Sequence, residues 1–264
     1  MFKNKNKKKN TNKFQTTLLM FVCVVLFLYV CFLLFWSPRE NLLVGNQPRP
    51  SYHIVVAKYK EDVSWFSHME PDKLYVYDKS GDKNSPYTPL ENKGREGSTF
   101  LGHIVKYYDH LPDYLIFVQG NPFPHMRPEI TPENFQQHIN RLIDSRPVRR
   151  QPLFCKYHEE PSHMYHGLLI DQYIRSIFNT KPKGTVRFAA GNQYIIPRKD
   201  ILKRPKAFYQ KLCDMAIKGD HYDANEGHNT PKKMDKSEII GWSLERIFDV
   251  IISDVPINKR FLPQ

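Results

Sequence analysis

Polar residues that could bind a small molecule stand beside three apolar runs in this chain. The runs are IVVA at 54–57, LIFV at 115–118 and the stretch AAGNQY at 189–194. The residues that follow or interrupt them are Lys58, Tyr59, Glu61 and Asp62, then Gln119, Gly120, Asn121 and His125, and finally Gly191 and Asn192. In open α/β sheets, ligands bind outside the carboxyl ends of the strands. If the runs are strands of one sheet, these residues are predicted to form the walls of one cleft.

Each of these corners also has a plainer interpretation. Asp62 equally fits the N-terminal cap of a helix. The segment 119–121 fits a turn stiffened by the prolines after it, and the pair 191–192 fits a hairpin corner. His125 fits a solvated loop histidine as well as a metal ligand. The three corners together favour a cleft more than any one of them does alone.

Two glutamates are the candidate acid or base catalysts. Glu96 opens a predicted helix after the sequence NKGR, so its side chain can face the functional edge of a sheet. Glu245 lies between Leu244 and Ile247 on a largely apolar helix, where a carboxylate needs a partner or a raised pKa. Arg246 is expected to point to another face of that helix. A buried structural salt bridge is an equal alternative to catalysis for each glutamate.

Several motifs that would name a chemistry are missing from the sequence. It contains no P-loop, no GxGxxG, no GxSxG and no HExxH, so it lacks the usual signatures of nucleotide, esterase and zinc-protease sites. Histidines and acids gather loosely in GDHYDANEGH at 219–228. Their loose spacing favours a solvated loop over a divalent-metal site.

The elements that must position these residues alternate along the chain. Strands are predicted over 53–59, 73–79, 114–120 and, with a glycine break, 185–201. Helices are predicted over 96–110, 131–144 with Thr131 as the cap, within 161–179, and over 204–219 and 237–253. Alternation of this kind indicates a sheet with helices on its faces. We therefore predict one three-layer α/β domain over 52–264.

The N-terminal residues predict a membrane anchor. Residues 1–13 hold six lysines and no acid, and 18–36 form an unbroken run of 19 apolar residues. A helix of that length spans about 28 Å, close to the hydrocarbon thickness of a bilayer. We predict a cytosolic tail at 1–13, a single-pass anchor at 14–36 and a stem at 37–51. By the positive-inside rule, the domain then lies on the lumenal or extracellular side.

The net charge of +12 does not by itself indicate a nucleic-acid partner. Six of the positive charges lie in the tail at 1–13, and the chain as a whole has 39 basic against 27 acidic residues. The basicity that remains for the domain is modest, so we expect no nucleic-acid binding. The membrane is the partner that the sequence predicts most directly.

Long stretches of the chain resemble a family of uncharacterised proteins, domain of unknown function 3431, found in fungi, bacteria and large viruses. The resemblance rests on VVAKYKEDVSWF, on GNQYIIPRKDILKRPKAFYQKL and LERIFDVII, and above all on the block at 92–125, NKGREGSTFLGHIVKYYDHLPDYLIFVQGNPFPH. The family in turn is similar to glycosyltransferases of the GT-A type. That likeness implies a mixed, mostly parallel sheet and transfer of a sugar from a nucleotide-sugar donor to a glycan acceptor.

The same likeness implies roles for individual residues. They are Tyr59, Glu61 and Asp62 near the base and ribose, Asn92, Arg95 and Glu96 by the donor, Gln119, Gly120, Asn121 and His125 near the diphosphate, and Gly191, Asn192 and Gln193 by the acceptor. The chain departs from the GT-A pattern where an Asp-x-Asp metal site is expected, because QGNPFPH stands there. Gln and Asn are weaker metal ligands than carboxylates. Either His125 or a distant acid completes a site for Mn²⁺ or Mg²⁺, or cations such as Arg95 and Arg198 neutralise the diphosphate.

Three hypotheses for function remain open at this point. The favoured one is a membrane-anchored, glycosyltransferase-like enzyme with Glu96 or Glu245 as base or donor-binding carboxylate. The second is a non-catalytic carbohydrate-binding or scaffold protein, and the third is a hydrolase that uses the two glutamates as a pair. All of them require Asp62, Glu96, Gln119, His125 and Asn192 to surround one hollow.

Overall fold

A computed structural model describes Met20, Val22 and residues 24–30, 48–161, 170–179, 185–218 and 236–253. The chain divides into two compact units, Met1–Pro48 and Arg49–Gln264. In the first unit, the described residues between 20 and 30 are helical and their apolar side chains are exposed. Most of the predicted tail, anchor and stem lies outside the described residues. Among those that are described, no helix is both long and apolar enough to cross a membrane.

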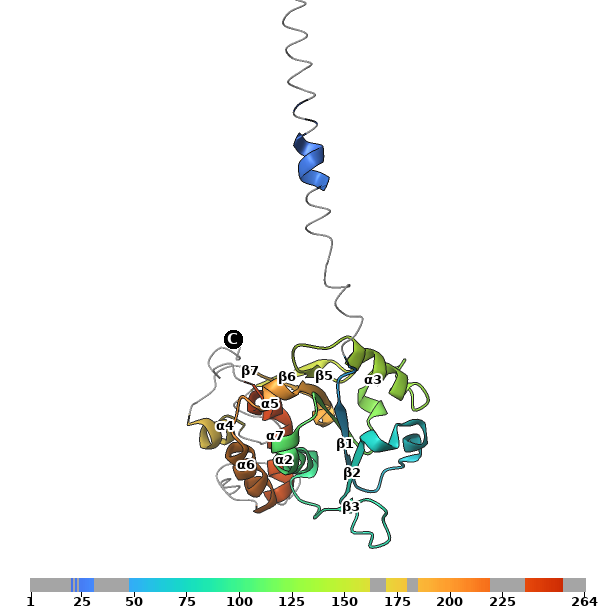
Figure 1. Ribbon diagram of the computed structural model, residues 1–264. Coiled ribbons are helices and arrows are strands. Elements are labelled where there is room, and N and C mark those ends of the chain that lie inside the picture. Colours follow the sequence, from blue (N-terminus) through green and yellow to red (C-terminus); the bar gives the residue numbers. More distant parts are fainter. Residues whose placement is uncertain are drawn as a thin grey trace, which may run out of the picture. The chain divides into compact units, whose positions relative to one another are not determined.

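The second unit is an α/β domain built on a mixed sheet of six strands, as predicted (Figure 1). Its strand order is β3-β2-β1-β4-β8-β5. The strands are β1 (Tyr52–Lys58), β2 (Leu74–Asp78), β3 (Thr88–Pro89), β4 (Tyr114–Gln119), β5 (Gln151–Pro152) and β8 (Tyr194–Pro197). The pairs among β3, β2, β1 and β4 are parallel, whereas β8 runs antiparallel to β4 and β5. A separate two-stranded sheet pairs β6 (Tyr157–Pro161) with β7 (Thr185–Ala189).

Alternating side chains of the two central strands serve two hydrophobic cores. Val55 and Phe117 face one core, whereas Ile54 and Ile116 face the other. This period of two follows from strand geometry, because successive side chains point to opposite faces. Burial on both faces explains why these strands read as continuous apolar runs instead of alternating ones.

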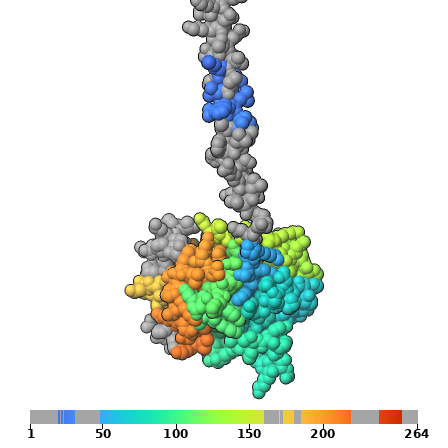
Figure 2. Space-filling model, in the orientation of Figure 1, coloured from blue at the N-terminus to red at the C-terminus, as the bar shows by residue number. Residues whose placement is uncertain are grey.

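Helices cover both faces of the sheet and make the predicted three layers. One face carries α2 (Arg95–Tyr107), α4 (Ile170–Phe178), α6 (Lys206–Lys218) and α7 (Lys236–Ile251). The other carries α3 (Phe135–Asp144) and the 3-10 turn η3 (Ser64–His68). Figure 1 shows α3 on one side of β1 and the group of α2, α6 and α7 on the other. In Figure 2, the surface of residues near 100, in green, lies between that of 50–90 and that of 185–218, in agreement with the contacts of α2 with β1 and α6.

Two local expectations were wrong. The helix for which Thr131 was the predicted N-cap begins at Phe135, with Asn134 in the N-cap position. The Asn134 side chain accepts a hydrogen bond from the Thr131 backbone N–H at 2.9 Å and donates one to Glu129 O at 2.9 Å. These bonds hold the preceding segment in a turn, since Asn competes well for local backbone groups. The helix that Asp62 was expected to cap, as one of its two interpretations, is only the 3-10 turn η3, and its N-cap position is Val63.

Candidate functional site

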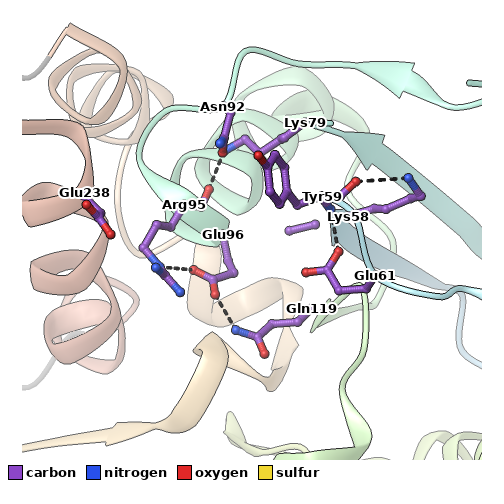
Figure 3. A pocket seen from close by; sticks show the side chains of 10 residues that line it. Lys58, Tyr59, Glu61, Lys79, Asn92, Arg95, Glu96, Gln119 and Glu238 are labelled. Carbon is purple, nitrogen blue, oxygen red and sulfur yellow. Dashed lines mark hydrogen bonds and ion pairs between the residues drawn. The ribbon is translucent and has the colours of Figure 1, made fainter. Parts of the chain in front are cut away.

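A polar cavity of about 380 Å³ opens at the carboxyl ends of β1, β2 and β4 (Figure 3). It is lined by Ala57, Lys58, Tyr59, Glu61, Lys79, Asn92, Arg95, Glu96, Gln119 and Glu238. Strand β1 is the point at which the chain changes direction across the sheet, because β2 lies on one side of it and β4 on the other. Such a switch point is where open α/β sheets bind ligands. The sheet rule that was applied to the sequence therefore leads to a real opening.

Glu96 forms the floor of this cavity and is held on both sides. Its side chain accepts a hydrogen bond from Gln119 Nε2 at the end of β4. Its other oxygen, Oε2, lies 3.5 Å from Arg95 Nε, within ion-pair distance. Figure 3 shows the three side chains meeting at one place. Glu96 is only 8% exposed, so both contacts matter for keeping its charge in place.

Arg95 is fixed by its backbone and by two residues of α7. Its φ of 48° is in the left-handed region, which a residue with a side chain rarely adopts. Its guanidinium lies 5.0 Å from the ring centre of Trp242, and Arg246 lies at the same distance from that ring. A side chain at Gly241 would collide with Arg95, since an added Cβ would lie 2.5 Å from Arg95 Cγ. Glycine at this point of α7 therefore makes room for Arg95.

The loop after β1 closes the cavity on the opposite side. Glu61 Oε2 accepts a hydrogen bond from the Tyr59 backbone N–H at 2.6 Å. The same carboxylate lies against Gly120, where an added Cβ would come within 2.5 Å of it. Trp65 donates from Nε1 to Gly120 O at 2.8 Å. The loops after β1 and β4 are thus locked to each other, and Tyr59 is left 39% exposed at the opening.

Two lysines at strand ends add positive charge to the lining. Lys58 donates to Asp78 Oδ2 at 2.7 Å. Burial opposes ionisation of Asp78, but hydrogen bonds from Lys58, Ser85 and Ser80 outweigh it and hold the Asp78 pKa well below its usual range. Lys79 is 5% exposed, and desolvation lowers its pKa to about 8 against the attraction of Glu96. Both lysines are positioned by the ends of parallel strands.

Glu245 lies behind the cavity and not on its surface. Its Oε1 accepts a hydrogen bond from the Gly191 N–H at 2.7 Å, and its Oε2 pairs with Arg246 at 2.6 Å. The expectation that Arg246 faces away from it is therefore wrong. Burial raises the pKa of Glu245, Arg246 opposes the rise, and the nearby charge of Glu96 adds to it. Glu245 has the salt bridge that was the alternative to catalysis.

The predicted convergence of five residues holds for two of them. Glu96 and Gln119 line the cavity, whereas Asp62, His125 and Asn192 are not among its lining residues. Asp62 accepts hydrogen bonds from the backbone N–H and the hydroxyl of Ser64, at 2.9 and 3.0 Å, just before the turn η3, whose N-cap position is Val63. His125 is exposed in the 3-10 turn η6 (Phe123–His125).

The remaining predicted residues fall into two groups. Tyr59, Glu61, Asn92 and Arg95 line the cavity, and Gly120 is packed against Glu61 in its wall. Asn121 is exposed, whereas Gly191, Asn192 and Gln193 are buried and support the corner after β4. Gly191 abuts the Gln119 side chain, where an added Cβ would lie 2.6 Å from Gln119 Cδ, and Gln193 Nε2 donates to Pro122 O at 3.1 Å.

Sequence reasoning missed Lys79 and Glu238 as cavity residues. Lys79 was in the predicted strand 73–79, so the rule about carboxyl ends of strands applied to it as well. Glu238 comes from the first turn of α7, and no local pattern announces its contact with this edge. Among the described residues, no group of three or more His, Cys, Asp or Glu side chains is arranged to hold a metal ion.

The fold and the cavity define an α/β protein with a ligand-sized polar site at the switch point of its sheet. A protein family described as "Protein of unknown function (DUF3431)" matches residues 54–259. The chain belongs to this family. The match covers most of the domain, including every residue that lines the cavity. A comparison with curated proteins finds no match to the chain.

Proposed function

We propose that the domain is a glycosyltransferase-like enzyme that binds a nucleotide diphosphate sugar in the cavity at the carboxyl ends of β1, β2 and β4. The position of that cavity is the observation on which the proposal depends. Its volume of about 380 Å³ lies in the range of small-molecule sites, roughly 300–1,000 Å³. The lining combines Lys58, Lys79 and Arg95 with Glu61, Glu96 and Glu238.

Charge and position suggest a division of labour inside the cavity. Arg95 would pair with the diphosphate, because a guanidinium can bind two phosphate oxygens at once. The half-exposed ring of Tyr59 would stack on the base at the opening. Glu96 would accept the proton of the acceptor hydroxyl as that oxygen bonds to the sugar carbon, while the bond from this carbon to the diphosphate breaks. A divalent cation such as Mn²⁺ would add charge neutralisation if a ligand set forms around the bound donor.

A membrane anchor over 14–36 remains part of the proposal. It is supported by the 19-residue apolar run at 18–36. It is also supported by the exposure of apolar side chains at the described positions within it, such as Met20 and Phe27. An exposed apolar helix needs a nonpolar environment or a partner. The domain would then face the lumen or the cell exterior.

The hydrolase hypothesis has less support than transfer. A glycosidase needs two carboxyl groups on opposite sides of one bond of the substrate. Glu245 is not among the residues that line the cavity, and both of its oxygens are engaged by Gly191 and Arg246. Of the two glutamates in that hypothesis, only Glu96 lines the cavity, and the cations beside it fit phosphate-leaving chemistry better.

The test is a thermal-shift screen of the full-length protein in detergent micelles. UDP, GDP, CDP, TDP and ADP are each added with and without Mn²⁺. We expect stabilisation by one of them, and loss of that shift in Arg95→Gln. The matched control is Arg198→Gln, because Arg198 pairs with Asp113 before β4 begins, at the opposite end of the strand from the cavity.

The outcomes separate the hypotheses. A shift in the parent and in Arg198→Gln, but not in Arg95→Gln, supports the proposed donor site. A shift without any sugar transfer or donor hydrolysis favours the non-catalytic binding protein. No shift with any nucleotide, with or without metal, would falsify the donor site.

A further inference from the structure

The polar groups that link the end of β2 to the start of α2 centre on one lysine. Lys79 Nζ donates to Lys93 O at 2.7 Å, to Ser98 Oγ at 2.7 Å and to Arg95 O. An ammonium group has three N–H donors, so the three acceptors use all of them. The side chain is 5% exposed. Burying an ammonium group costs desolvation free energy even when all of its donors are bonded. The three hydrogen bonds of Lys79 therefore call for a functional explanation.

All three acceptors belong to the segment that presents Arg95 and Glu96 to the cavity. Lys93 and Arg95 contribute backbone carbonyls on either side of Gly94. That turn is the strained part of the helix start, because Gly94 and Arg95 have φ values of 64° and 48°. A non-glycine residue holds such a conformation only when its surroundings enforce it. Lys79 donates a hydrogen bond to each of the two carbonyls and so links them across the turn.

Ser98 closes a hydrogen-bond network with Lys79 and the two carbonyls. Its hydroxyl accepts from Lys79, and it lies 2.5 Å from Lys93 O and 3.1 Å from Arg95 O. The hydroxyl can therefore donate to one of the same carbonyls that Lys79 bonds. Two side chains and two carbonyls then define the orientation of the first turn of α2. The orientation of this turn then determines where the guanidinium of Arg95 and the carboxylate of Glu96 lie.

We propose that Lys79 is a positioning residue for the proposed donor site, which holds the strained first turn of α2 so that Arg95 is set for the diphosphate and Glu96 for the acceptor hydroxyl. This inference rests on the proposed function for its ligand. It assigns Lys79 no direct contact with the sugar. Lys79 acts through Arg95 and Glu96. The inference predicts that nucleotide affinity and the local order of residues 92–99 fall together when the hydrogen bonds of Lys79 are lost.

The charges around Lys79 give the proposal a signature in its pH dependence. Glu96 of α2 and Cys213 of α6 favour the charged form, whereas Arg95 of α2 and burial oppose it, and burial is the largest influence. The resulting pKa of about 8 means that the ammonium loses its proton in mildly alkaline solution. Charge-assisted hydrogen bonds then become weaker neutral ones. Affinity for a nucleotide diphosphate should fall as the pH rises from 7 to 9.

The experiment uses the full-length protein in detergent and the nucleotide diphosphate that gives the largest thermal shift. Isothermal titration compares the parent with Lys79→Met, Lys79→Arg, Ser98→Ala and the control Lys106→Met. Lys106 is exposed on the same helix and is not among the cavity residues. We expect about a tenfold loss of nucleotide affinity in Lys79→Met, because the charge-assisted hydrogen bonds that hold the first turn of α2 are lost. Ser98→Ala should lose about two- to threefold, since it removes one acceptor of Lys79 and one neutral hydrogen bond to a carbonyl but keeps the ammonium.

The conservative variant separates positioning from simple structural support. Arginine stays charged at every pH of the experiment, so Lys79→Arg should retain more affinity than Lys79→Met and should not weaken between pH 7 and 9. Hydrogen exchange gives a readout that needs no nucleotide. In Lys79→Met, amides of residues 92–99 should exchange faster while those of α6 and α7 keep their protection.

Each result decides between the proposals. If the parent binds no nucleotide, the proposed donor site is wrong. Faster exchange confined to residues 92–99 in Lys79→Met would then still support the role of Lys79 in holding the first turn of α2. If Lys79→Met binds like the parent, or if its exchange rises evenly through the domain, Lys79 is not a positioning residue. Equal pH profiles for the parent and Lys79→Arg would also overturn the inference.

Discussion

Helix α2 is attached to the sheet by two polar clusters that differ in charge. The neutral cluster is His53 of β1, Tyr77 of β2 and His103 of α2, with His103 between the other two. His103 Nδ1 lies 2.8 Å from the Tyr77 hydroxyl, and its Nε2 lies 3.1 Å from His53 Nδ1. The charged cluster is Lys79, Arg95, Glu96 and Gln119, at the start of the same helix.

The two clusters solve the problem of burying polar groups in opposite ways. The neutral cluster is surrounded by the aromatic rings of Tyr75 and Tyr107, and His103 is fully buried. The charged cluster keeps its ions beside an opening of about 380 Å³. A fully hydrogen-bonded neutral network stabilises the folded state. Ions held beside a cavity instead lose hydration free energy on folding, and such a cost is typical of functional sites. The comparison predicts that stability depends on the first cluster and ligand binding on the second.

The largest expected effect is a loss of stability in acid. Burial lowers the pKa of His53 to about 4 and that of His103 to about 2, whereas both would be near 6.5 in the unfolded chain. The unfolded state therefore binds more protons below pH 6.5, and stability falls as the pH falls through that value. Between pH 7 and 5 the pair should cost about 3–4 kcal/mol. Urea unfolding at each pH, followed by tryptophan fluorescence, measures it.

The control for this prediction is His103→Ala. That variant should be less stable at pH 7, but its stability should depend less on pH, by up to about 1.4 kcal/mol per pH unit. Glu245 acts in the opposite direction, because its raised pKa makes the folded state take up a proton as the pH falls. It affects both proteins alike. Parallel stability curves for the two proteins would show that His103 is not held neutral.

Removing one hydroxyl tests the neutral cluster at constant pH. Tyr77→Phe leaves His103 Nδ1 without its 2.8 Å contact in a buried place, and we expect a loss of about 1–2 kcal/mol. Tyr75→Phe is the matched control on the same strand, because the Tyr75 ring is only partly buried, and it should change stability by less than about 0.5 kcal/mol. Equal effects from the two variants would contradict a special role for the network.

A third prediction concerns the carboxylate that proved to lie behind the cavity. Glu245→Gln keeps an acceptor for the Gly191 N–H but removes the negative charge that pairs with Arg246 at 2.6 Å. We expect a loss of about 1–3 kcal/mol in unfolding free energy. Nucleotide affinity should stay within about threefold of the parent. A variant as stable as the parent would mean that the buried Arg246 guanidinium does not depend on the Glu245 charge.

The sequence predicted the framework of the domain but not how similar corners are used. The strands β1, β2 and β4 and the helices α2, α6 and α7 were all expected from their patterns. The dipeptides at 120–121 and 191–192 are both Gly-Asn after a strand. Asn121 is exposed beside the cavity, whereas Asn192 is fully buried. Helix α7 packs over the second corner, and Glu245 accepts a hydrogen bond from Gly191. No local pattern distinguishes the two.

The same reasoning explains which site residues could be found. Glu96, Gln119 and Tyr59 stand beside strand or helix ends that periodicity locates, so the rule for sheet edges brought them together. His103 and Lys79 looked like ordinary residues of a helix and a strand. Their importance comes from partners 50 and 19 positions away, His53 and Ser98. The short strands β3 and β5, of two residues each, owe their pairing to neighbours and carry no pattern of their own.

The smallest effect on stability is expected for Glu96→Gln, and it divides the two glutamates most clearly. The amide can still accept a hydrogen bond from Gln119. The variant loses the 3.5 Å pair with Arg95, whose side chain is 38% exposed, and the attraction between the Glu96 charge and Lys79. Loss of the Glu96 charge also relieves its repulsion of Glu245. The unfolding free energy should therefore change by less than about 1 kcal/mol.

Function should respond in the opposite order. If Glu96 takes the acceptor proton, Glu96→Gln should lower sugar transfer at least about 100-fold, with nucleotide affinity retained. Glu245→Gln should lose stability but keep most of its turnover below its melting temperature. Parallel unfolding curves and donor-turnover assays on the two variants provide the measurement. A destabilised Glu96→Gln with normal turnover, beside a stable but inactive Glu245→Gln, would reverse the assignment and place the reacting carboxylate on α7.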